Sequence, residues 1–411
     1  MTLLAEADAG RRVAAPHTDD RTTDRGPTLP KISVSIPYRR RLHNLGLVLE
    51  SLARQTMDRA EFEVVVGAME YAEEYVDLCR RFTDRLDIVS VVSSREFHIP
   101  HARNLAMRQA SGEIVVQMDA DTLLPPDALR NLYDRHFAFG QRVCVVGQVV
   151  GYGNNNDGDV TSIEPLPYDA HLANLDAMAA APDWPADPRF QVDHVIPWAF
   201  GWTGLIALPR ALVREHRLYF DESFRGWGVD DLEWSYRVCA SGTPIVLRPD
   251  VYALHLPHLR DTAANRVTET ANYRRFLRKW PGPDVELAHA IGDVEANARY
   301  LEFRRELRAV GEGRPVGTLR GRVAGRSVLV VGAALDPGRR PVDPAVGDLF
   351  DDGAAVEALP LAGLALPYDE GEVDEARVLP AVGRFSAGWR DAVAAEAARV
   401  ARRVTWVGEP G

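Results

Sequence analysis

Short apolar runs alternate with segments of helical periodicity over residues 31–121 of the chain. Four runs have the length and character of buried strands, namely Ile32–Ile36, Phe62–Val66, Ile88–Val92 and Ile114–Met118. The segments between them predict helices, because apolar residues recur there on one helical face, as at Leu45, Val48, Leu49 and Leu52. Strands that alternate with helices indicate parallel βαβ units, and therefore an α/β fold with a doubly wound sheet.

The pattern is less regular in the second half of the chain. Residues 142–150 predict a further strand, whereas residues 151–197 lack clear periodicity, so that segment is either functional or mobile. Beyond it the spacing predicts short strands at 245–247 and 251–254, and helices at 209–216, 231–241, 265–280 and 285–307.

The length of 411 residues is sufficient for two domains or more. Residues 1–30 are rich in Asp, Arg and Thr and are predicted to be disordered. We expect a main domain at 31–285, a helix and a Gly- and Arg-rich linker at 286–325, and a small Rossmann-like appendage at 326–411. The appendage lacks a G-x-G-x-x-G motif, so we expect it to be non-catalytic and not needed for the chemistry.

Composition narrows the function classes. The net charge is −11 and no Lys/Arg block stands out, so nucleic acid is not an expected partner. The three cysteines are far apart and lack metal-ligand spacing, which favours reduced thiols in a cytoplasmic protein. No apolar run reaches membrane-spanning length, and no signal-peptide core is present, so we expect no transmembrane segment.

The strand at Ile114–Met118 leads directly into two carboxylates, Asp119 and Asp121, separated by Ala120. Acids at i and i+2 share a face in extended chain, and open α/β sheets bind ligands at the carboxyl ends of their strands. This placement suggests a metal ion held against phosphates. The alternative is a solvated loop in which Asp121 caps a following helix.

A second motif is the run Gly226-Trp227-Gly228-Val229-Asp230-Asp231. The glycines bend the backbone and expose an indole, and two carboxylates follow at the predicted start of a helix. A helix N-terminus stabilises a carboxylate in its ionised form, which suits a general base. The alternative is that Asp230 caps the helix and Trp227 is an ordinary core residue.

Two histidines, His255 and His258, follow a short apolar strand. A neutral imidazole is a common ligand for transition metals, including Mn²⁺. We prefer His255 as the ligand because it ends the strand, while His258 follows Pro257 and can point to solvent. The alternative is a structural histidine.

Taken together, these stretches resemble inverting glycosyltransferases of the family 2 type, which have the GT-A fold with a doubly wound mixed sheet. The resemblance extends from about Ile32 to Trp280, and its further markers are Ala102-Arg103-Asn104, Gly112-Glu113 and Phe220-Asp221-Glu222. The second half is similar to the C-terminal parts of β-1,4-galactosyltransferases and polypeptide N-acetylgalactosaminyltransferases. The resemblance implies transfer of a hexosyl or N-acetylhexosaminyl unit from a nucleotide-sugar, with a UDP-sugar as the expected donor.

The resemblance also implies a role for each matching position. Asp231 is the expected base, Asp230 positions the acceptor, and Asp121 and His255 bind Mn²⁺ or Mg²⁺. On the donor side we expect Pro37, Tyr38, Arg39, Glu70, Arg103, Asp119 and Ala120, with Glu70 replacing the family's usual acid after the second strand. On the acceptor side we expect Trp202, Gly204, Trp227 and Gly228. Arg103 is about equally well explained as a buried salt bridge between two helices.

Two rival functions use similar residues. A sugar-1-phosphate nucleotidyltransferase would also need paired acids and a metal, but it has no need for the motif at 226–231. A non-catalytic sugar-binding or scaffold protein would not need Asp121, Asp231 and His255. The acceptor we expect is a small molecule, a natural product or a glycan, and the sequence leaves a homodimer open.

Overall fold

The computed structural model describes residues 2–5, 29–151, 165–185, 187–259 and 261–408. The chain forms two compact units, one of Met1–Val192 with Phe200–Glu269 and one of Asp193–Ala199 with Thr270–Gly411. Most of the N-terminal segment predicted to be disordered, and residues 152–164 and 186 of the aperiodic stretch at 151–197, lie outside the described residues. Thr2–Ala5 is described, and it forms a strand where disorder was predicted.

The first unit is built on a nine-stranded mixed sheet in the order β1-β4-β3-β2-β5-β8-β7-β9-β6. The predicted parallel core is confirmed, because β2 pairs in parallel with both β3 and β5, and β3 pairs in parallel with β4. β8 pairs antiparallel with β5, which makes the sheet mixed. The strands are β1 (Thr2–Ala5), β2 (Ile32–Tyr38), β3 (Phe62–Ala68), β4 (Ile88–Val92), β5 (Ile114–Met118), β6 (Thr122–Leu123), β7 (Cys144–Val150), β8 (Leu205–Pro209) and β9 (Ile245–His255).

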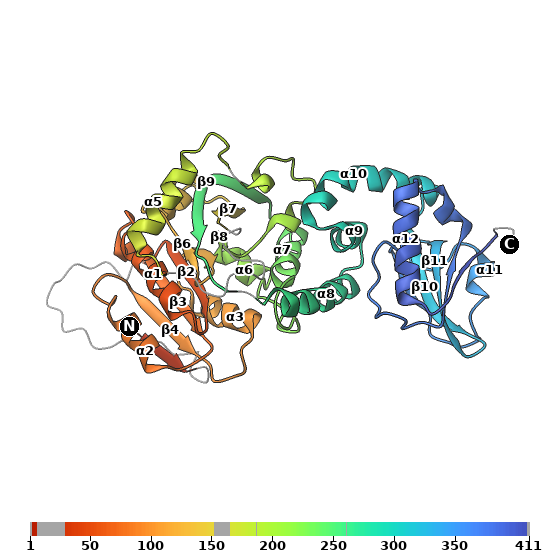
Figure 1. Ribbon diagram of the computed structural model, residues 1–411, viewed down its shortest axis with the longest axis horizontal. Helices are drawn as coiled ribbons and strands as arrows, with labels where there is room; N and C mark the ends of the chain where they lie inside the picture. The colour runs from red at the N-terminus through yellow and green to blue at the C-terminus, as the bar shows by residue number, and fades with distance from the viewer. Residues whose placement is uncertain (1, 6–28, 152–164, 186, 260, 409–411) are drawn as a thin grey trace. The chain divides into compact units, whose positions relative to one another are not determined.

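Most of the helices lie where the periodicity predicted them, but α5 (Tyr168–Ala179) forms within the stretch at 151–197 for which no helix was predicted. In α1 the expected apolar face is fully buried, at Leu45, Val48, Leu49 and Leu52. Figure 1 shows the helices of this unit around the strands. They are α1 (Leu42–Ala53), α2 (Glu73–Arg80), α3 (Ile99–Gln109), α4 (Ala128–His136), α5 (Tyr168–Ala179), α6 (Arg210–Glu215) and α7 (Asp230–Ala240), and α8 (Thr262–Lys279) begins here.

The parallel strands end at one edge of the sheet, and this edge gathers the motifs. Pro37 pairs with Gly67 across β2 and β3, so the residues that follow both strands lie side by side. Gly67 is required there, because a Cβ atom would lie 2.0 Å from the carbonyl oxygen of Ala102 in α3. The start of α3 therefore packs directly against the end of β3.

The second unit contains a five-stranded sheet in the order β12-β10-β11-β13-β14. The prediction of a linker at 311–325 is wrong for most of its length, because Val316–Val323 forms β10 and pairs antiparallel with β11. Its glycines reflect close packing, since Cβ atoms at Gly317 and Gly321 would lie 2.3 Å and 2.4 Å from Leu335 and Phe350. The remaining elements are α9 (Pro283–Ile291), α10 (Asp293–Val310), β11 (Arg326–Ala334), α11 (Pro344–Gly347), β12 (Glu357–Leu359), β13 (Glu375–Val378), α12 (Ala387–Val400) and β14 (Val404–Trp406).

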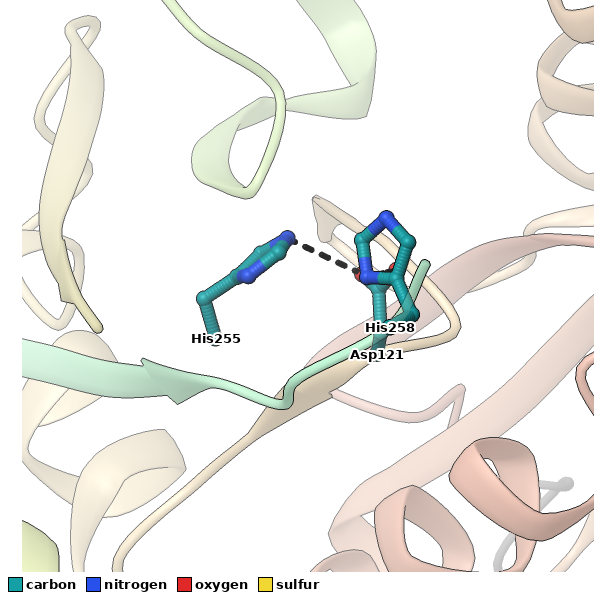
Figure 2. Close-up of side chains that lie close together, drawn as sticks. All are labelled: Asp121, His255 and His258. Carbon is teal, nitrogen blue, oxygen red and sulfur yellow. Dashed lines mark ion pairs between the residues drawn. The ribbon is translucent and has the colours of Figure 1, made fainter. Parts of the chain in front are cut away.

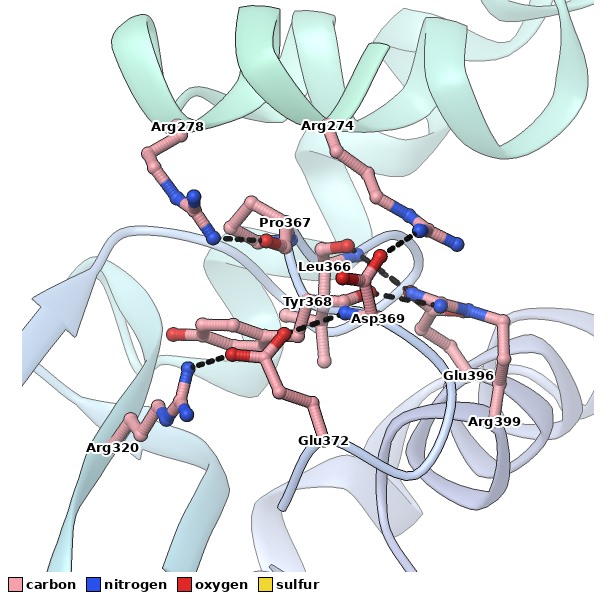
Figure 3. A network of polar contacts seen from close by, with 10 residues as sticks. All are labelled: Arg274, Arg278, Arg320, Leu366, Pro367, Tyr368, Asp369, Glu372, Glu396 and Arg399. Atoms are coloured by element: carbon pink, nitrogen blue, oxygen red, sulfur yellow. Dashed lines mark hydrogen bonds and ion pairs between the residues drawn. The ribbon is translucent and has the colours of Figure 1, made fainter. Parts of the chain in front are cut away.

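Arginines of the second unit bind the turn at residues 366–369, as Figure 3 shows. Arg274 forms an ion pair with Asp369, and Arg278 donates to the carbonyl oxygen of Pro367 at 2.5 Å. Arg399 donates to the carbonyl oxygen of Tyr368 at 2.9 Å. The C-terminal sheet is thus bonded to the end of α8 within one unit that begins, apart from residues 193–199, at Thr270 rather than at residue 326.

No helix within the described part of the chain is long and apolar enough to cross a membrane. All three cysteines are free, and Cys79 and Cys144 are buried.

Candidate functional site

The edge of the sheet at which the parallel strands end begins with the residues at the end of β2. Tyr38 is buried and stacks on Tyr75 with ring centroids 4.7 Å apart, so its ring belongs to the core. The Arg39 guanidinium lies 4.9 Å from the centroid of the Phe97 ring. The Glu70 carboxylate accepts a 2.6 Å hydrogen bond from the backbone N–H of Arg40, so it lies beside the residues that follow β2.

The Asp119–Asp121 motif follows β5 at the same edge. Asp121 is 2 % exposed, which excludes the alternative of a solvated loop. Asp119 points to another partner, the guanidinium of Arg103, at 3.2 Å. Ala120 between them is buried, and the two acids serve different neighbours.

Asp121, His255 and His258 form a compact group of possible metal ligands, shown in Figure 2. One ligand atom from each lies within 4.8 Å of the others. The pairing of β6 with β9 explains this convergence, because Thr122 lies opposite His255 and the N–H of Leu256 donates to the carbonyl oxygen of Asp121 at 2.7 Å. The donor set of one carboxylate and two imidazoles suits a divalent transition metal.

Both histidines face Asp121, so the preference for His255 over His258 finds no support in the geometry. His258 Nδ1 lies 3.3 Å from Oδ2 of Asp121, and His255 Nε2 lies 3.8 Å from Oδ1. Burial lowers the pKa of His258 to about 4, with Arg41 and His255 adding to the effect and Asp121 opposing it. The His258 ring is therefore neutral near pH 7, which is the form that binds metals.

Sequence reasoning missed Arg41, which forms an ion pair with Oδ2 of Asp121. Arg41 immediately precedes α1 and follows two other arginines. The signal was the run of three arginines at the carboxyl end of a central strand, which is an unusual concentration of positive charge at a ligand-binding edge.

Arg103 joins Asp119 to the start of α7. It is buried, and its guanidinium contacts Asp230 Oδ2 at 2.5 Å as well as Asp119. Arg103 thus forms the buried salt bridge weighed as an alternative to phosphate binding. Burial raises the pKa of Asp230, and the charge of Arg103 opposes that rise.

Asp231 has a different environment from its neighbour. Its side chain is only half-buried, and it accepts a 2.9 Å hydrogen bond from the N–H of Leu232. Removal from water, followed by the charge of Asp230, raises the pKa of Asp231 to about 7, although Arg103 opposes the shift. A carboxyl with this pKa can both accept and release a proton near neutral pH.

The loop before α7 exposes the indole of Trp227 to solvent. The backbone has positive φ at Gly226 (73°), Gly228 (92°) and Val229 (72°), a conformation that favours glycine. The Trp227 side chain is 40 % exposed, so it is not an ordinary core residue, and the backbone N–H of Trp227 donates to Thr268 Oγ1 at 3.1 Å. Val229 occupies the cap position without a side-chain bond, which excludes Asp230 as the cap.

The other residues expected on the acceptor side lie near two segments, the one that precedes the 226–229 loop and the one that precedes β8. Asn104 exchanges hydrogen bonds with the backbone of Phe220, at 2.8 Å and 2.9 Å, and so fixes the segment that precedes the loop. The Trp202 ring lies 3.9 Å from the guanidinium of Arg189, which occupies that face of the ring. Gly204 is buried just before β8. The structure does not bring Trp202 and Trp227 into a described contact with each other.

Residues 33–192 match the family described as Glycosyl transferase family 2. The chain is similar to a validoxylamine A glucosyltransferase of Streptomyces hygroscopicus subsp. jinggangensis. The two are 28% identical over 414 aligned residues, which cover 92% of this chain and 96% of that protein.

Solved structures with a similar arrangement include two glycosyltransferases. The mannosyltransferase PcManGT of Pyrobaculum calidifontis has a TM-score of 0.43 and 20% identity, covering 70% of this chain and 79% of that one. Residues 1–349 of TarS from Staphylococcus aureus have a TM-score of 0.45 and 14% identity, covering 76% of this chain and 99% of that one.

Proposed function

We propose that the chain is a glycosyltransferase with a family 2 domain, which residues 33–192 match, and that it carries out a metal-dependent, inverting transfer reaction. The donor is a nucleotide-sugar, with a UDP-sugar as first choice. The acceptor is a hydroxyl or amine of a small molecule, a natural product or a glycan. Neither rival, the nucleotidyltransferase nor the scaffold protein, is favoured by the family match.

One observation carries the proposal: the two acids of the Asp119–Asp121 motif have different partners. Asp121 faces His255 and His258, while Asp119 is joined through Arg103 to Asp230, the first residue of α7. A cation site and a carboxyl with a pKa of about 7 are the two groups that diphosphate departure and hydroxyl activation need.

Asp121, His255 and His258 would hold the metal, and their two imidazole nitrogens favour Mn²⁺ over Mg²⁺. A divalent cation bound there supplies Lewis-acid neutralisation of the charge that develops on the diphosphate. Arg39 and Glu70 lie on the same edge and are proposed to contact the donor.

Asp231 is the proposed base. Its carboxylate accepts the proton of the acceptor hydroxyl as the acceptor oxygen forms a bond to the anomeric carbon. The bond from that carbon to the diphosphate oxygen breaks at the same time, and its electron pair leaves with the nucleoside diphosphate. A single displacement inverts the anomeric carbon. Asp230 cannot share this role easily, because Arg103 holds it in a buried ion pair.

The acceptor site is proposed to lie at Trp227 and Gly228. An exposed indole provides an apolar surface for the face of a sugar ring. The relative that matches over most of its length is named for validoxylamine A, which supports a polar small molecule as the acceptor. Cytoplasmic location and a homodimer stay predictions.

The proposal is tested by mixing the purified chain with a panel of UDP-, GDP- and TDP-sugars, validoxylamine A and other polyol or amine acceptors, in the presence of Mn²⁺, Mg²⁺ or EDTA. We expect acceptor-dependent release of nucleoside diphosphate from at least one donor, lost in EDTA, with an inverted anomeric linkage by proton NMR. Diphosphate release from a sugar 1-phosphate and a nucleoside triphosphate, without glycosyl transfer, would support the nucleotidyltransferase instead.

A further inference from the structure

We propose that Arg41 is a built-in competitor for the cation site, occupying Asp121 until a divalent metal displaces it. This inference rests on the metal site of the proposed function and concerns how that site is controlled. It predicts that the chain balances the buried Asp121 charge with its own side chain and sets the metal affinity through the same contact.

The contact is made at the atom that a metal ion would need. Arg41 Nη1 pairs with Oδ2 of Asp121, and the same oxygen is 3.3 Å from His258 Nδ1. His255 approaches the other oxygen, Oδ1. A cation bound by all three ligands would therefore share Oδ2 with the Arg41 guanidinium or displace it.

The charge balance explains why an arginine is useful here. Asp121 is 2 % exposed, and a buried carboxylate without a counter-charge is strongly unfavourable. Of the three side chains described in contact with Asp121, Arg41 is the one with a permanent positive charge. The ion pair therefore stabilises the site when no metal is bound.

The exposure of Arg41 also allows its side chain to move away from Asp121 into solvent. The Arg41 side chain is 44% exposed while Asp121 is 2% exposed, so one partner of the pair can move into water and the other cannot. A monovalent ion would replace one unit charge by another and gain little. A divalent ion adds a second charge next to the carboxylate, which favours Mn²⁺ or Mg²⁺ over Na⁺ or K⁺.

The test measures binding of Mn²⁺ alone to the full chain, by electron paramagnetic resonance of free Mn²⁺, without donor or acceptor. We expect Arg41→Met to bind Mn²⁺ about tenfold more tightly than wild type, because the competing cation is gone. Arg41→Lys keeps the charge and should stay within about threefold of wild type.

Arg40→Met is the matched control, because Arg40 is an exposed neighbour whose described bond, through its backbone N–H, goes to Glu70 and not to Asp121. It reports the effect of losing one nearby positive charge. Equal changes in Mn²⁺ affinity for Arg41→Met and Arg40→Met would overturn the proposal.

Two further results separate this inference from the proposed function. If wild type binds Mn²⁺, Asp121→Asn does not, and Arg41→Met matches wild type, the metal site stands and the competitor role is overturned. If neither wild type nor Arg41→Met binds Mn²⁺, the metal site itself is wrong and the inference falls with it. As a second readout, Mn²⁺ should raise the melting temperature of Arg41→Met more than that of wild type, because the variant lacks the internal counter-charge.

Discussion

Asp231 in the first unit and Glu286 in the second are carboxyls of the same apparent character. Removal from water is the main cause that raises the pKa of each to about 7. Both lie in helices, and either could be taken for a catalytic acid or base from that pKa alone. Their surroundings, however, differ completely.

Glu286 is enclosed by the backbone of a turn. It is fully buried in α9 and accepts hydrogen bonds from the N–H groups of Ala362, Gly363 and Leu364, at 2.8, 2.7 and 2.7 Å. These donors use both carboxylate oxygens, so no position remains for a substrate. Glu286 therefore holds residues 362–364, which directly precede the turn at 366–369 that Arg274 and Arg278 bind.

Asp231 is instead half-buried, and its described neighbours are charged groups rather than a ring of backbone donors. The comparison teaches that a raised pKa reports loss of water, while the neighbours decide whether the proton can be used. One carboxyl stabilises a fold, and the other is available to a reacting hydroxyl.

The largest expected effect comes from exchanging each carboxyl for its amide and measuring transfer. Asp231→Asn should lower kcat about 1000-fold while nucleoside diphosphate binding stays near normal, because an amide cannot accept the proton. Glu286→Gln, the matched change outside the site, should leave kcat within about threefold in the folded chain. Near-normal turnover of Asp231→Asn would move the base to another residue.

The second effect is on stability: Glu286→Gln should lower the free energy of unfolding, and Asp231→Asn should not. Glu286→Gln should destabilise the second unit by about 2 kcal/mol, because the amide nitrogen cannot accept from the backbone donors. Hydrogen exchange of the amides at 361–366, followed by mass spectrometry, should accelerate in this variant but not in Asp231→Asn. Glu370→Gln is a suitable control, because Glu370 is exposed on the same turn. Unchanged exchange in Glu286→Gln would show that the turn does not depend on the carboxylate.

Much of the first unit could be predicted from the sequence, because β2, β3, β4 and β5 are apolar throughout and alternate with amphipathic helices. The placement of Asp119 and Asp121 followed from the rule that parallel strands end at one edge. The roles of individual acids did not follow from it. That Asp230 pairs with Arg103, and Asp231 does not, depends on how α3 meets α7.

The remaining misses have one physical cause, which is that they depend on contacts distant in sequence. His255 was preferred to His258 because His258 follows Pro257, yet the ring of His258 also faces Asp121, with Nδ1 3.3 Å from Oδ2. The run of three arginines at 39–41 indicates a charged edge of the sheet, but it does not indicate that Arg41 pairs with Asp121. Glu286 looks like any helical glutamate until the turn at 362–364 is placed against it. The glycines of β10 have the composition of a linker, although close packing requires them.

The smallest effect, and the one that separates the two carboxyls most directly, is the response to pH. The folded pKa of Glu286, about 7, lies above its model value of 4.5, so the native state retains a proton that the unfolded chain has lost. Stability should therefore be full below pH 4.5 and should fall as the pH rises toward 7, with the loss complete above it. Between pH 6 and 8 the expected decline is about 1 kcal/mol.

Transfer should change in the opposite direction over the same range. Asp231 must be ionised to act as a base, so kcat should rise about tenfold from pH 6 to pH 8 and level off above the pKa of about 7. The measurement is a pair of profiles, melting temperature and kcat against pH, for wild type and Glu286→Gln. The variant should have a flatter stability profile and an unchanged rate profile, because its substitution removes one titration and leaves the other. A rate profile that moves with Glu286→Gln would mean that the two carboxyls are not independent, and that the second unit contributes to the chemistry.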